Sequence, residues 1–413
     1  MKKIVALALA IVLMMPMFTA CANTSPAEDL QKEIYSPSTV SAEEAVPEES
    51  EADEKTDIPT GMKIGFVYSP ESDALSRTYR HSLKYITEAF GCEVIFADML
   101  DPSNEAMIGY YENLIQQGAE GLVMLFPISV AFLQDLENKG IYYTFINTGD
   151  PDIQEFLKTA EHYCGSLVSL DSSDPDRGAS YVMTTNMLNC LYEAGCRNLV
   201  YTGIAAGNTD HDQRYLAWTE FLENHDDVVA VAEYRGAEAA SGMSDILASY
   251  GNEIDGICVS DSAFPAVAAS VVSAGLQEQI KMSSFDMHDI IPDLMKAGTV
   301  VGVGGGNTAF FETCFVMLYN KWSGADDILS EDESKCIPIP NLFVINDGAA
   351  YEAYETFFTG DLPALTADEL KELCSYYNPD TTIQEKNDYM WWLADGENYN
   401  LEAIAERHAD LVG

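Results

Sequence analysis

The chain has 413 residues, of which 67 are Asp or Glu and 21 are Lys or Arg, so its formal net charge at pH 7 is −46. A protein this acidic is a poor partner for nucleic acid and anionic lipid, because both bind to basic patches. The length is too great for one ordinary core and suits two lobes. We therefore expect an acidic two-lobed protein that does not bind nucleic acid.

The first 21 residues are expected to direct the chain out of the cytoplasm. Lys2 and Lys3 precede an apolar stretch over residues 4–18, and small residues lead up to Cys21. This order is typical of a secretory signal peptide, and the apolar stretch is too short for a stop-transfer helix. A cysteine at this place resembles the signal of bacterial lipoproteins, with Phe18 where that motif usually has Leu.

The lipoprotein resemblance implies that residues 1–20 are removed and that Cys21 carries a diacylglycerol. Two acyl chains give stable attachment to a membrane. We therefore expect the mature protein to be lipid-anchored on the extracytoplasmic face of the cell membrane. An ordinary signal peptide with an incidental Cys21 is the alternative.

Residues 21–60 are predicted to be a flexible acidic tether. Residues 22–60 contain eleven Asp and Glu against two lysines, and they are rich in Ser, Thr, Pro and Ala. Such a segment buries too little apolar surface to offset the entropy of ordering. The tether would hold the folded body away from the membrane.

Apolar runs then recur along the rest of the chain and are predicted to be strands. They are continuous and rich in Val, Ile, Leu and Phe, as expected of parallel strands that are covered on both faces. The predicted strands are residues 63–69, 92–98, 121–127, 141–147, 165–171, 198–204, 228–234, 256–261, 280–286, 300–304 and 342–346.

Amphipathic stretches lie between these runs and are predicted to be helices. They include residues 76–90, 104–117, 130–139, 177–194, 213–224, 265–274 and 308–322. Alternating strands and helices indicate right-handed βαβ units in open α/β sheets. In such sheets ligands bind beyond the carboxyl ends of the strands.

Polar residues follow several predicted strands and are candidates for ligand contact. Asp261 and Asp286 are each the last residue of a predicted strand, where a carboxylate would accept hydrogen bonds from a hydroxyl-rich ligand. Capping of the next helix is an equally good interpretation of their position. For Asp174 and Asp289 we expect capping.

Several short segments occur in an order that resembles the type I periplasmic binding proteins, the superfamily of ribose-binding proteins and of the lactose-repressor core. The resemblance covers residues 62–324. The segments are residues 63–67, 115–124, 139–142, 174–178, 214–218, 260–261 and 285–286.

This resemblance implies an α/β fold of two lobes, each a parallel-rich sheet flanked by helices, with three hinge crossings near Leu170, Gly306 and Pro340. It places residues 61–170 and 306–340 in the N-terminal lobe. Residues 171–305 and 341–413 would form the C-terminal lobe, with an extended C-terminus that the family core lacks.

The resemblance also implies a set of ligand-binding residues in the cleft between the lobes. Arg214 would be a bidentate donor from the second lobe, and Asp261 would accept from ligand hydroxyls. The full set is Asp73, Leu75, Asn147, Thr148, Arg214, Asp261, Asp286 and Asn307. Asn147 and Thr148 replace a common Asp-Arg pair, and Leu75 and Ser76 replace two aromatic residues, so the identity of the ligand stays open.

Other motifs favour structural roles. The glycine-rich segment 302–307 has Asn307 where a dinucleotide-binding motif needs its third glycine, so we interpret it as a hinge or a close packing contact. His211 and His288 lie in acidic loops and are interpreted as solvated or capping residues rather than metal ligands. No cofactor and no metal are expected. Most of the eight cysteines after Cys21 are expected to be buried free thiols, with Cys190 and Cys196 as the one local pair worth testing.

These observations predict a monomeric, lipid-anchored binding protein rather than an enzyme. A sugar or polyol-like solute would bind between the lobes, and the closed form would dock on the membrane permease of an ABC importer. The alternative is a sensor that presents a sugar, nucleoside or signalling furanose to a membrane receptor kinase and transports nothing. An enzyme would need turnover that depends on Asp261 or Asp286, and the sequence contains no nucleophile elbow, zinc-protease helix or Walker loop.

Overall fold

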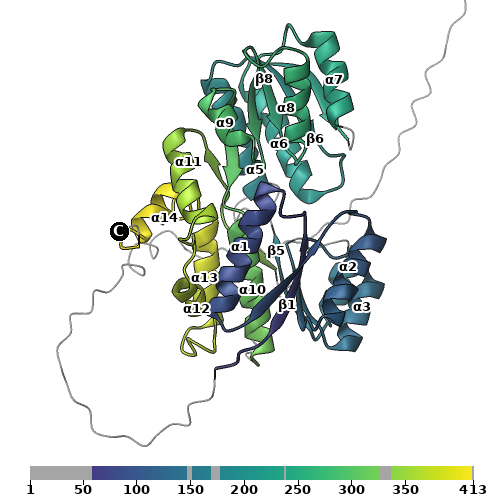
Figure 1. Ribbon diagram of the computed structural model, residues 1–413, viewed down its shortest axis with the longest axis vertical. Coiled ribbons are helices and arrows are strands. Elements are labelled where there is room, and N and C mark those ends of the chain that lie inside the picture. The colour runs from purple at the N-terminus through teal and green to yellow at the C-terminus, as the bar shows by residue number, and fades with distance from the viewer. Residues whose placement is uncertain (1–57, 147–150, 169–176, 237–238, 325–335, 412–413) are drawn as a thin grey trace, which may run out of the picture. The chain divides into compact units, whose positions relative to one another are not determined.

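The computed structural model describes residues 58–146, 151–168, 177–236, 239–324 and 336–411. These residues form two six-stranded sheets, with strand orders β11-β5-β4-β3-β1-β2 and β12-β10-β9-β8-β6-β7. Each sheet with the helices packed on it is one lobe, and the first lobe lies below the second in Figure 1. The predicted two-lobed α/β fold is therefore confirmed.

The strands follow the predicted apolar runs closely. The first sheet contains β1 (Lys63–Tyr68), β2 (Glu93–Asp98), β3 (Gly121–Met124), β4 (Tyr142–Phe145), β5 (Tyr163–Val168) and β11 (Cys336–Pro338). The second contains β6 (Asn198–Gly203), β7 (Val229–Arg235), β8 (Gly256–Val259), β9 (Lys281–Ser284), β10 (Val300–Gly305) and β12 (Phe343–Ile345).

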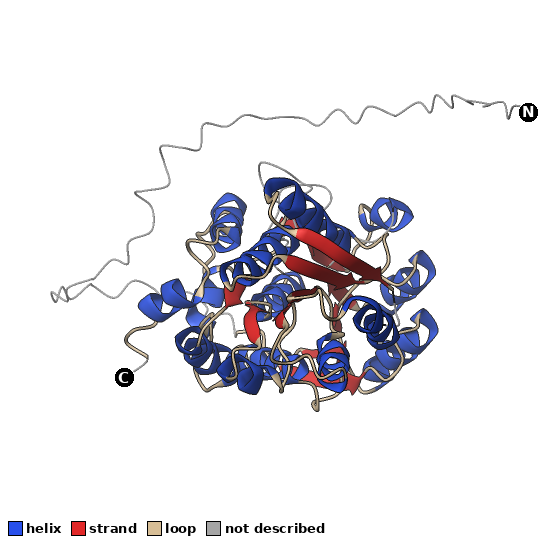
Figure 2. Cartoon of the chain, turned by 90° about the horizontal axis from the view of Figure 1, so that it is seen from above, coloured by secondary structure: helices blue, strands red, loops and turns tan. Residues whose placement is uncertain are grey.

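Helices connect most of the strands and enclose the sheets, as Figure 2 shows from above. Up to the third crossing they are α1 (Ala74–Ala89), α2 (Asn104–Gln116), α3 (Val130–Lys139), α4 (Pro151–Leu157), α5 (Ala179–Glu193), α6 (Thr209–Asn224), α7 (Ala239–Tyr250), α8 (Phe264–Ser273), α9 (Ile291–Lys296) and α10 (Thr308–Trp322). After it come α11 (Gly348–Tyr354), the π-helix η1 (Glu355–Thr359), α12 (Ala367–Glu372), α13 (Ile383–Ala394) and α14 (Leu401–Arg407).

The continuous apolar runs arise because both faces of each sheet are covered. In β3, Leu122 and Met124 pack into a core with α2 and α3, whereas Val123 packs into a core with α1 and α10. Successive side chains of a strand point to opposite faces, so every position of a doubly covered strand must be apolar. All strand pairs are parallel except β10 with β12.

The chain passes between the lobes three times. One crossing follows β5, the second follows β10 at Gly306, and the third joins β11 to β12. Gly306 has φ +99°, and a Cβ there would lie 2.9 Å from the carbonyl oxygen of Asn341 on the third crossing. Only glycine fits this conformation and this close approach.

Residues 348–411, called the C-terminal segment below, contact both lobes. Helix α11 packs against α9 and β12 of the second lobe, whereas η1, α12 and α13 pack against α1, α10 and β11 of the first. In Figure 1 this segment runs beside α1 and α10. The assignment of residues 341–413 to the C-terminal lobe, like the other domain boundaries, stays a prediction.

The C-terminal segment also binds the hinge crossings directly. The buried Tyr399 side chain donates a hydrogen bond to the Gly306 carbonyl (3.4 Å), and Asn341 Nδ2 donates to the Tyr399 carbonyl (2.9 Å). The backbone amide of Asn341 donates to the Leu393 carbonyl (2.9 Å). Two of the three crossings are thus held by the same segment.

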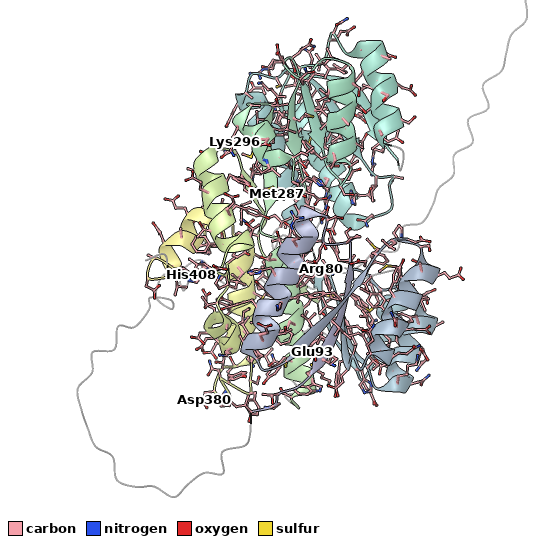
Figure 3. All side chains as sticks on the ribbon, in the orientation of Figure 1. Arg80, Glu93, Met287, Lys296, Asp380 and His408 are labelled. Carbon is pink, nitrogen blue, oxygen red and sulfur yellow. The ribbon has the colours of Figure 1, made fainter. Side chains whose placement is uncertain are left out.

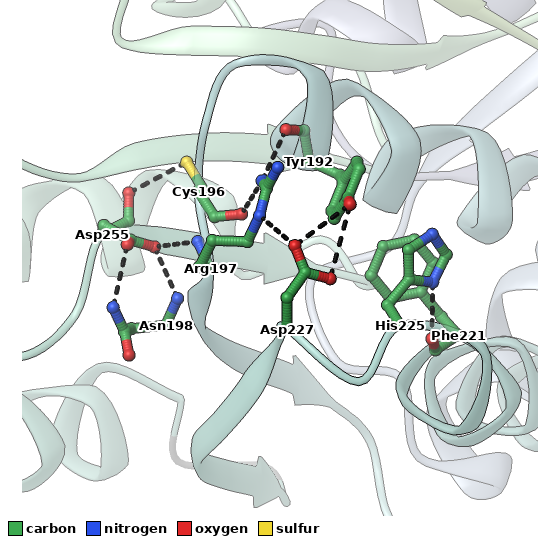
Figure 4. A network of polar contacts seen from close by, with 8 residues as sticks. All are labelled: Tyr192, Cys196, Arg197, Asn198, Phe221, His225, Asp227 and Asp255. Atoms are coloured by element: carbon green, nitrogen blue, oxygen red, sulfur yellow. Dashed lines mark hydrogen bonds and ion pairs between the residues drawn. The ribbon is translucent and has the colours of Figure 1, made fainter.

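One polar network fixes the far end of the second sheet. The Asp255 carboxylate accepts from the backbone amides of Arg197 and Asn198 (2.9 and 2.8 Å), and the Arg197 side chain pairs with Asp227 (2.8 Å) (Figure 4). These residues precede or begin β6, β7 and β8, so the network lies at the amino ends of the strands. It orders the loops there and is remote from the ligand end that the fold predicts.

The eight cysteines among the described residues are free, and six of them are buried. This agrees with the expectation of buried free thiols and gives no support to a Cys190–Cys196 disulfide. Within the same part of the chain, none of the helices is long and apolar enough to cross a membrane.

Candidate functional site

A cavity of about 280 Å³ lies between the lobes, where the carboxyl ends of both sheets meet. The first lobe contributes aromatic and apolar side chains, and the second contributes the charged ones. The first-lobe wall consists of Tyr68, Tyr79, Leu125, Ile146, Phe310 and Phe311, and the second-lobe wall includes Ser180, Ile204, Asp210, His211, Arg214, Asp261, Ser262, Phe285 and Asp286. Asn307, Ile339 and Leu342 line it from the crossings.

The start of α6 places two charged residues at this cavity. The side chain of Asn208 caps the helix by accepting from the amides of Asp210 (3.1 Å) and His211 (3.3 Å). Residues four positions apart share one face of a helix, so Asp210 and Arg214 point the same way. Capping by Asn208 therefore helps fix the part of the second-lobe wall that α6 supplies.

Arg214 is held in place by two contacts within its own lobe. Its Nη1 donates to the carbonyl oxygen of Ser260 (2.6 Å), and its guanidinium lies 3.3 Å from the centroid of the Phe285 ring. Its Nε is buried and has no hydrogen-bond partner in the described parts of the chain. A buried donor without a partner is costly, so a ligand atom that accepts a hydrogen bond from this Nε would contribute favourably to the free energy of binding.

Three carboxylates surround this arginine. Burial raises the pKa of Asp210, Asp261 and Asp286, and the charge of Arg214 partly offsets the effect in each case. Burial, followed by the charges of Arg214 and Arg235, lowers the pKa of His211 to about 3, so this imidazole is neutral at pH 7. By composition the second-lobe wall therefore has three acidic side chains and one arginine, with burial opposing ionisation of the acidic groups and Arg214 favouring it.

The first-lobe wall offers hydroxyl groups and aromatic faces. Tyr68 ends β1, and its ring packs edge-on against Tyr79 of α1, with centroids 5.0 Å apart. Burial, with Asp286 and Asp73 nearby, raises the pKa of the Tyr68 hydroxyl, so it stays protonated. Flat aromatic walls beside polar groups suit a ligand that has an apolar face and a polar rim.

Four of the predicted site residues meet at this cavity: Arg214, Asp261, Asp286 and Asn307. Asp261 has a second role, since its Oδ1 accepts from the Ala263 amide (3.0 Å). Whether these four contact a ligand stays a prediction, because proximity to a cavity is a weaker statement than binding.

Two other predicted site residues, Asp73 and Leu75, are not among the residues that line it. Asp73 caps α1 by accepting from the Ser76 amide (2.8 Å), and Leu75 is buried in the core. Asn147, Thr148 and Cys21 lie outside the described residues, as does Asp174. The expectation that Asp289 caps a helix is wrong, because α9 starts after Ile290 and the Asp289 carboxylate forms an ion pair with Arg77 of α1.

Sequence reasoning missed the aromatic wall. Tyr68 is the last residue of β1, and its position at a strand end could have marked it as a candidate. Phe310 and Phe311 follow the hinge residue Asn307. Their orientation depends on how α10 packs against the first sheet, which no local pattern specifies. Both phenylalanines belong to α10, in which residues 308–320 are all buried. Nothing in the sequence therefore distinguishes them from ordinary core residues.

A second hollow of about 580 Å³ runs along the outside of the boundary between the lobes. Arg80 of the first lobe and Met287 of the second, both labelled in Figure 3, line it, together with Tyr351 and Glu355 of the C-terminal segment. Arg80 is committed to Asp98 (2.6 Å) and Arg77 to Asp289. Two arginines in this hollow are therefore already paired with carboxylates. In the described residues, no cluster of three or more His, Cys, Asp or Glu is arranged to hold a metal ion.

Comparison with known proteins matches this architecture to one family. A family model described as a periplasmic binding protein domain matches residues 64–324, which is more than half of the chain. No curated protein matches the chain in a sequence search.

Solved structures with the same fold share little sequence with it. A galactofuranose-binding protein has a TM-score of 0.55 and 13% identity, over 70% of this chain and 96% of that one. An ABC transporter periplasmic solute-binding protein from Actinobacillus succinogenes 130z, with bound D-allose, has 0.54 and 16%, over 69% and 97%. An ABC transporter solute-binding protein from Bacillus halodurans C-125, with bound myo-inositol, has 0.52 and 14%, over 73% and 99%. At these identities the likeness establishes the fold alone.

Proposed function

This chain belongs to the periplasmic binding protein family, with its type I fold, and we propose that it is the lipid-anchored receptor of an ABC importer for a sugar- or polyol-like solute. The solute would bind in the cavity between the lobes. The observation that carries the proposal is the position of Arg214, whose buried Nε has no hydrogen-bond partner among the described residues and whose cavity also contains Asp261 and Asp286. The family is one of binding proteins, so no catalytic residue is assigned.

The chemistry of the cavity supports a hydroxyl-rich ligand. Carboxylates accept hydrogen bonds from hydroxyl groups, and the guanidinium donates to hydroxyl or ring oxygens. The aromatic side chains of Tyr68 and Phe311 would cover the apolar face of a ring. The similar structures with bound D-allose and myo-inositol are consistent with this class of ligand.

Binding and transport would be linked by closure of the lobes. A ligand that contacts both walls favours the closed state, because only that state makes both sets of contacts. The closed form would then dock on the membrane permease. Within this proposal Cys21 carries the lipid, residues 21–60 are the tether, and the protein acts as a monomer at the cell surface.

A thermal-shift screen of the purified protein against sugars, polyols, nucleosides and amino acids tests the ligand class. A ligand at about 100 times its Kd adds roughly 2.7 kcal/mol to the free energy of unfolding, which raises the Tm measurably. We expect rises with sugars or polyols, and loss of the rise in Arg214→Ala. A response confined to amino acids or nucleosides would contradict the proposal.

A further inference from the structure

The charges at the cavity do not balance. Asp210, Asp261 and Asp286 line it, against Arg214 as the one Lys or Arg among its described lining residues, and His211 is neutral. Residues 147–150 and 169–176, which follow β4 and β5, contain no Lys or Arg that would restore the balance. The described lining therefore has a formal excess of two acidic over basic side chains.

Arg214 does not neutralise any of these carboxylates by direct contact. Its guanidinium is bound to the Ser260 carbonyl and stacked on Phe285, and within the described ranges it forms no ion pair. It acts on Asp286 only through space. The guanidinium is therefore available to a ligand as a donor, but it leaves most of the negative charge uncompensated.

Of the three carboxylates, Asp286 has the fewest hydrogen bonds within the described parts of the protein. Asp261 accepts from the Ala263 amide, and Ser180 hydrogen-bonds to Asp210. For Asp286, no donor to the carboxylate is found in the parts of the chain that the structure describes. The Asp286 side chain is half-buried, and a carboxylate drawn partly out of water without donors or a cation is costly.

The opposite wall would also attract a cation. Tyr68, Phe310 and Phe311 face the cavity from the first lobe. The face of an aromatic ring attracts an ammonium group, and the attraction grows when both are desolvated. Carboxylates on one side and aromatic rings on the other together form an environment suited to an organic cation that also carries hydroxyl groups.

We propose that the preferred ligand carries a protonated amine, so that it is an amino sugar or an amino polyol rather than a neutral one. The amine would lie against Asp286, and the hydroxyl groups would contact Arg214 and Asp261. This inference rests on the proposed function and narrows it to a substrate class.

Matched pairs of probes test it directly by calorimetric titration at pH 7. The pairs are D-glucosamine with D-glucose, D-galactosamine with D-galactose, and D-glucamine with D-sorbitol, with N-acetyl-D-glucosamine as a probe of similar shape without the charge. We expect at least one amine to bind tenfold or more tightly than both its neutral partner and, for glucosamine, the N-acetyl form. The preference should persist at 0.5 M NaCl, because a buried pair is screened less than the overall charge of the chain.

Two substitutions separate the roles of the site residues. Asp286→Asn should reduce the amine preference to less than threefold and change the affinity for the neutral partner far less. Arg214→Ala should weaken amine and neutral partner alike. The matched control is Asp212→Asn, on the same helix as Arg214 but paired with Arg235 outside the cavity lining, which should leave the preference unchanged.

The outcomes show separately whether the amine preference fails or the proposed function fails. Neutral sugars that bind as tightly as their amines would overturn the inference and leave the proposed function standing. A preference that survives in Asp286→Asn, or that disappears in 0.5 M NaCl, would also overturn it. Absence of binding by every sugar and polyol would overturn both.

Discussion

The guanidinium of Arg214 stacks on the ring of Phe285 at 3.3 Å, and both residues belong to the second lobe. The same guanidinium donates to the carbonyl of Ser260. A side chain held on two sides loses little rotamer freedom when a ligand arrives. The second lobe therefore presents the Arg214 guanidinium to the cavity already in place, before the lobes close.

Replacing Arg214 by Lys should weaken ligand binding at least tenfold, because an ammonium keeps the charge but loses the planar stack and the forked donor geometry. Titration calorimetry measures the affinity, and thermal unfolding without ligand measures the stability. The matched control is Arg235→Lys, since Arg235 also stacks on a ring, Tyr215 at 4.2 Å, without lining the cavity. Both variants should lose about 1 kcal/mol of stability. Equal loss of binding in the two would contradict the role given to Arg214.

The ion pair between Arg77 and Asp289 joins the two lobes at their boundary. Both side chains are about half exposed, so the pair contributes little to stability, under about 1 kcal/mol. It forms only while the lobes are close, and Arg77→Ala should therefore favour the open state and weaken binding two- to fivefold, with a larger effect at low salt. Small-angle scattering and calorimetry in 20 and 500 mM NaCl measure this. Restored affinity in Arg77→Asp combined with Asp289→Arg would verify the pairing, and unchanged affinity in Arg77→Ala would refute it.

Asn341 and Asn320 both bind the C-terminal segment, Asn341 from a hinge crossing and Asn320 from α10, so the two can be compared. Both are buried, and each donates to a backbone carbonyl of that segment at 2.9 Å, Asn341 to Tyr399 and Asn320 to Leu373. Replacing either by Ala leaves a buried acceptor without its donor and should cost about 1–3 kcal/mol. Only Asn341 lies on a crossing, so only Asn341→Ala should also change the rates of ligand binding and release, measured by stopped-flow fluorescence. Equal effects on the rates would show that the hinge contact has no special role.

Glu312 should make stability fall as the pH rises through neutrality. It is almost completely buried on α10, and burial, partly offset by a hydrogen bond from Ser82 (2.6 Å) and reinforced by Glu369, raises its pKa to about 7. A carboxyl group with a raised pKa in the folded state favours folding while it is protonated, and this contribution is lost as the pH rises from about 4.5 past 7.

Glu312→Gln should therefore be more stable than the original protein at pH 8, by roughly 3 kcal/mol, and differ by less than about 1 kcal/mol at pH 5. Urea unfolding at both pH values measures the difference. Glu88→Gln, an exposed change on α1, is the control and should show no such pH dependence. A constant difference between Glu312→Gln and the original protein at both pH values would contradict the raised pKa.

The sequence was sufficient to predict the lobes because each doubly covered strand must be apolar throughout. It also indicated Asp261 and Asp286 through their strand ends, and the family pattern added Arg214 and Asn307. All four line the cavity, and their contact with a ligand stays a prediction. The short strand β11 was missed, because three residues that include Pro338 carry no recognisable period.

The rest depended on packing between distant segments. Leu75 sits in the first turn of α1, and its burial follows from where Asp73 starts that helix. The partner of Asp289 lies 212 residues away on α1, a distance in sequence that no local pattern spans. The contacts of Tyr399 with the hinge also join residues far apart in sequence, so no local pattern predicts them.

The attachment of the C-terminal segment to the hinge also orders the events of folding. Strands β1 to β5 and strands β6 to β10 each come from one continuous stretch, residues 63–168 and 198–305, whereas β11 and β12 complete the two sheets only later in the chain. Contacts that are near in sequence form before distant ones, because the latter require closure of longer loops. The two crossings acquire their contacts with Leu393 and Tyr399 only when nearly the whole chain is present. A polypeptide that emerges amino end first thus completes the joint between its lobes last, and a chain cut short before residue 393 would lack these contacts at the joint.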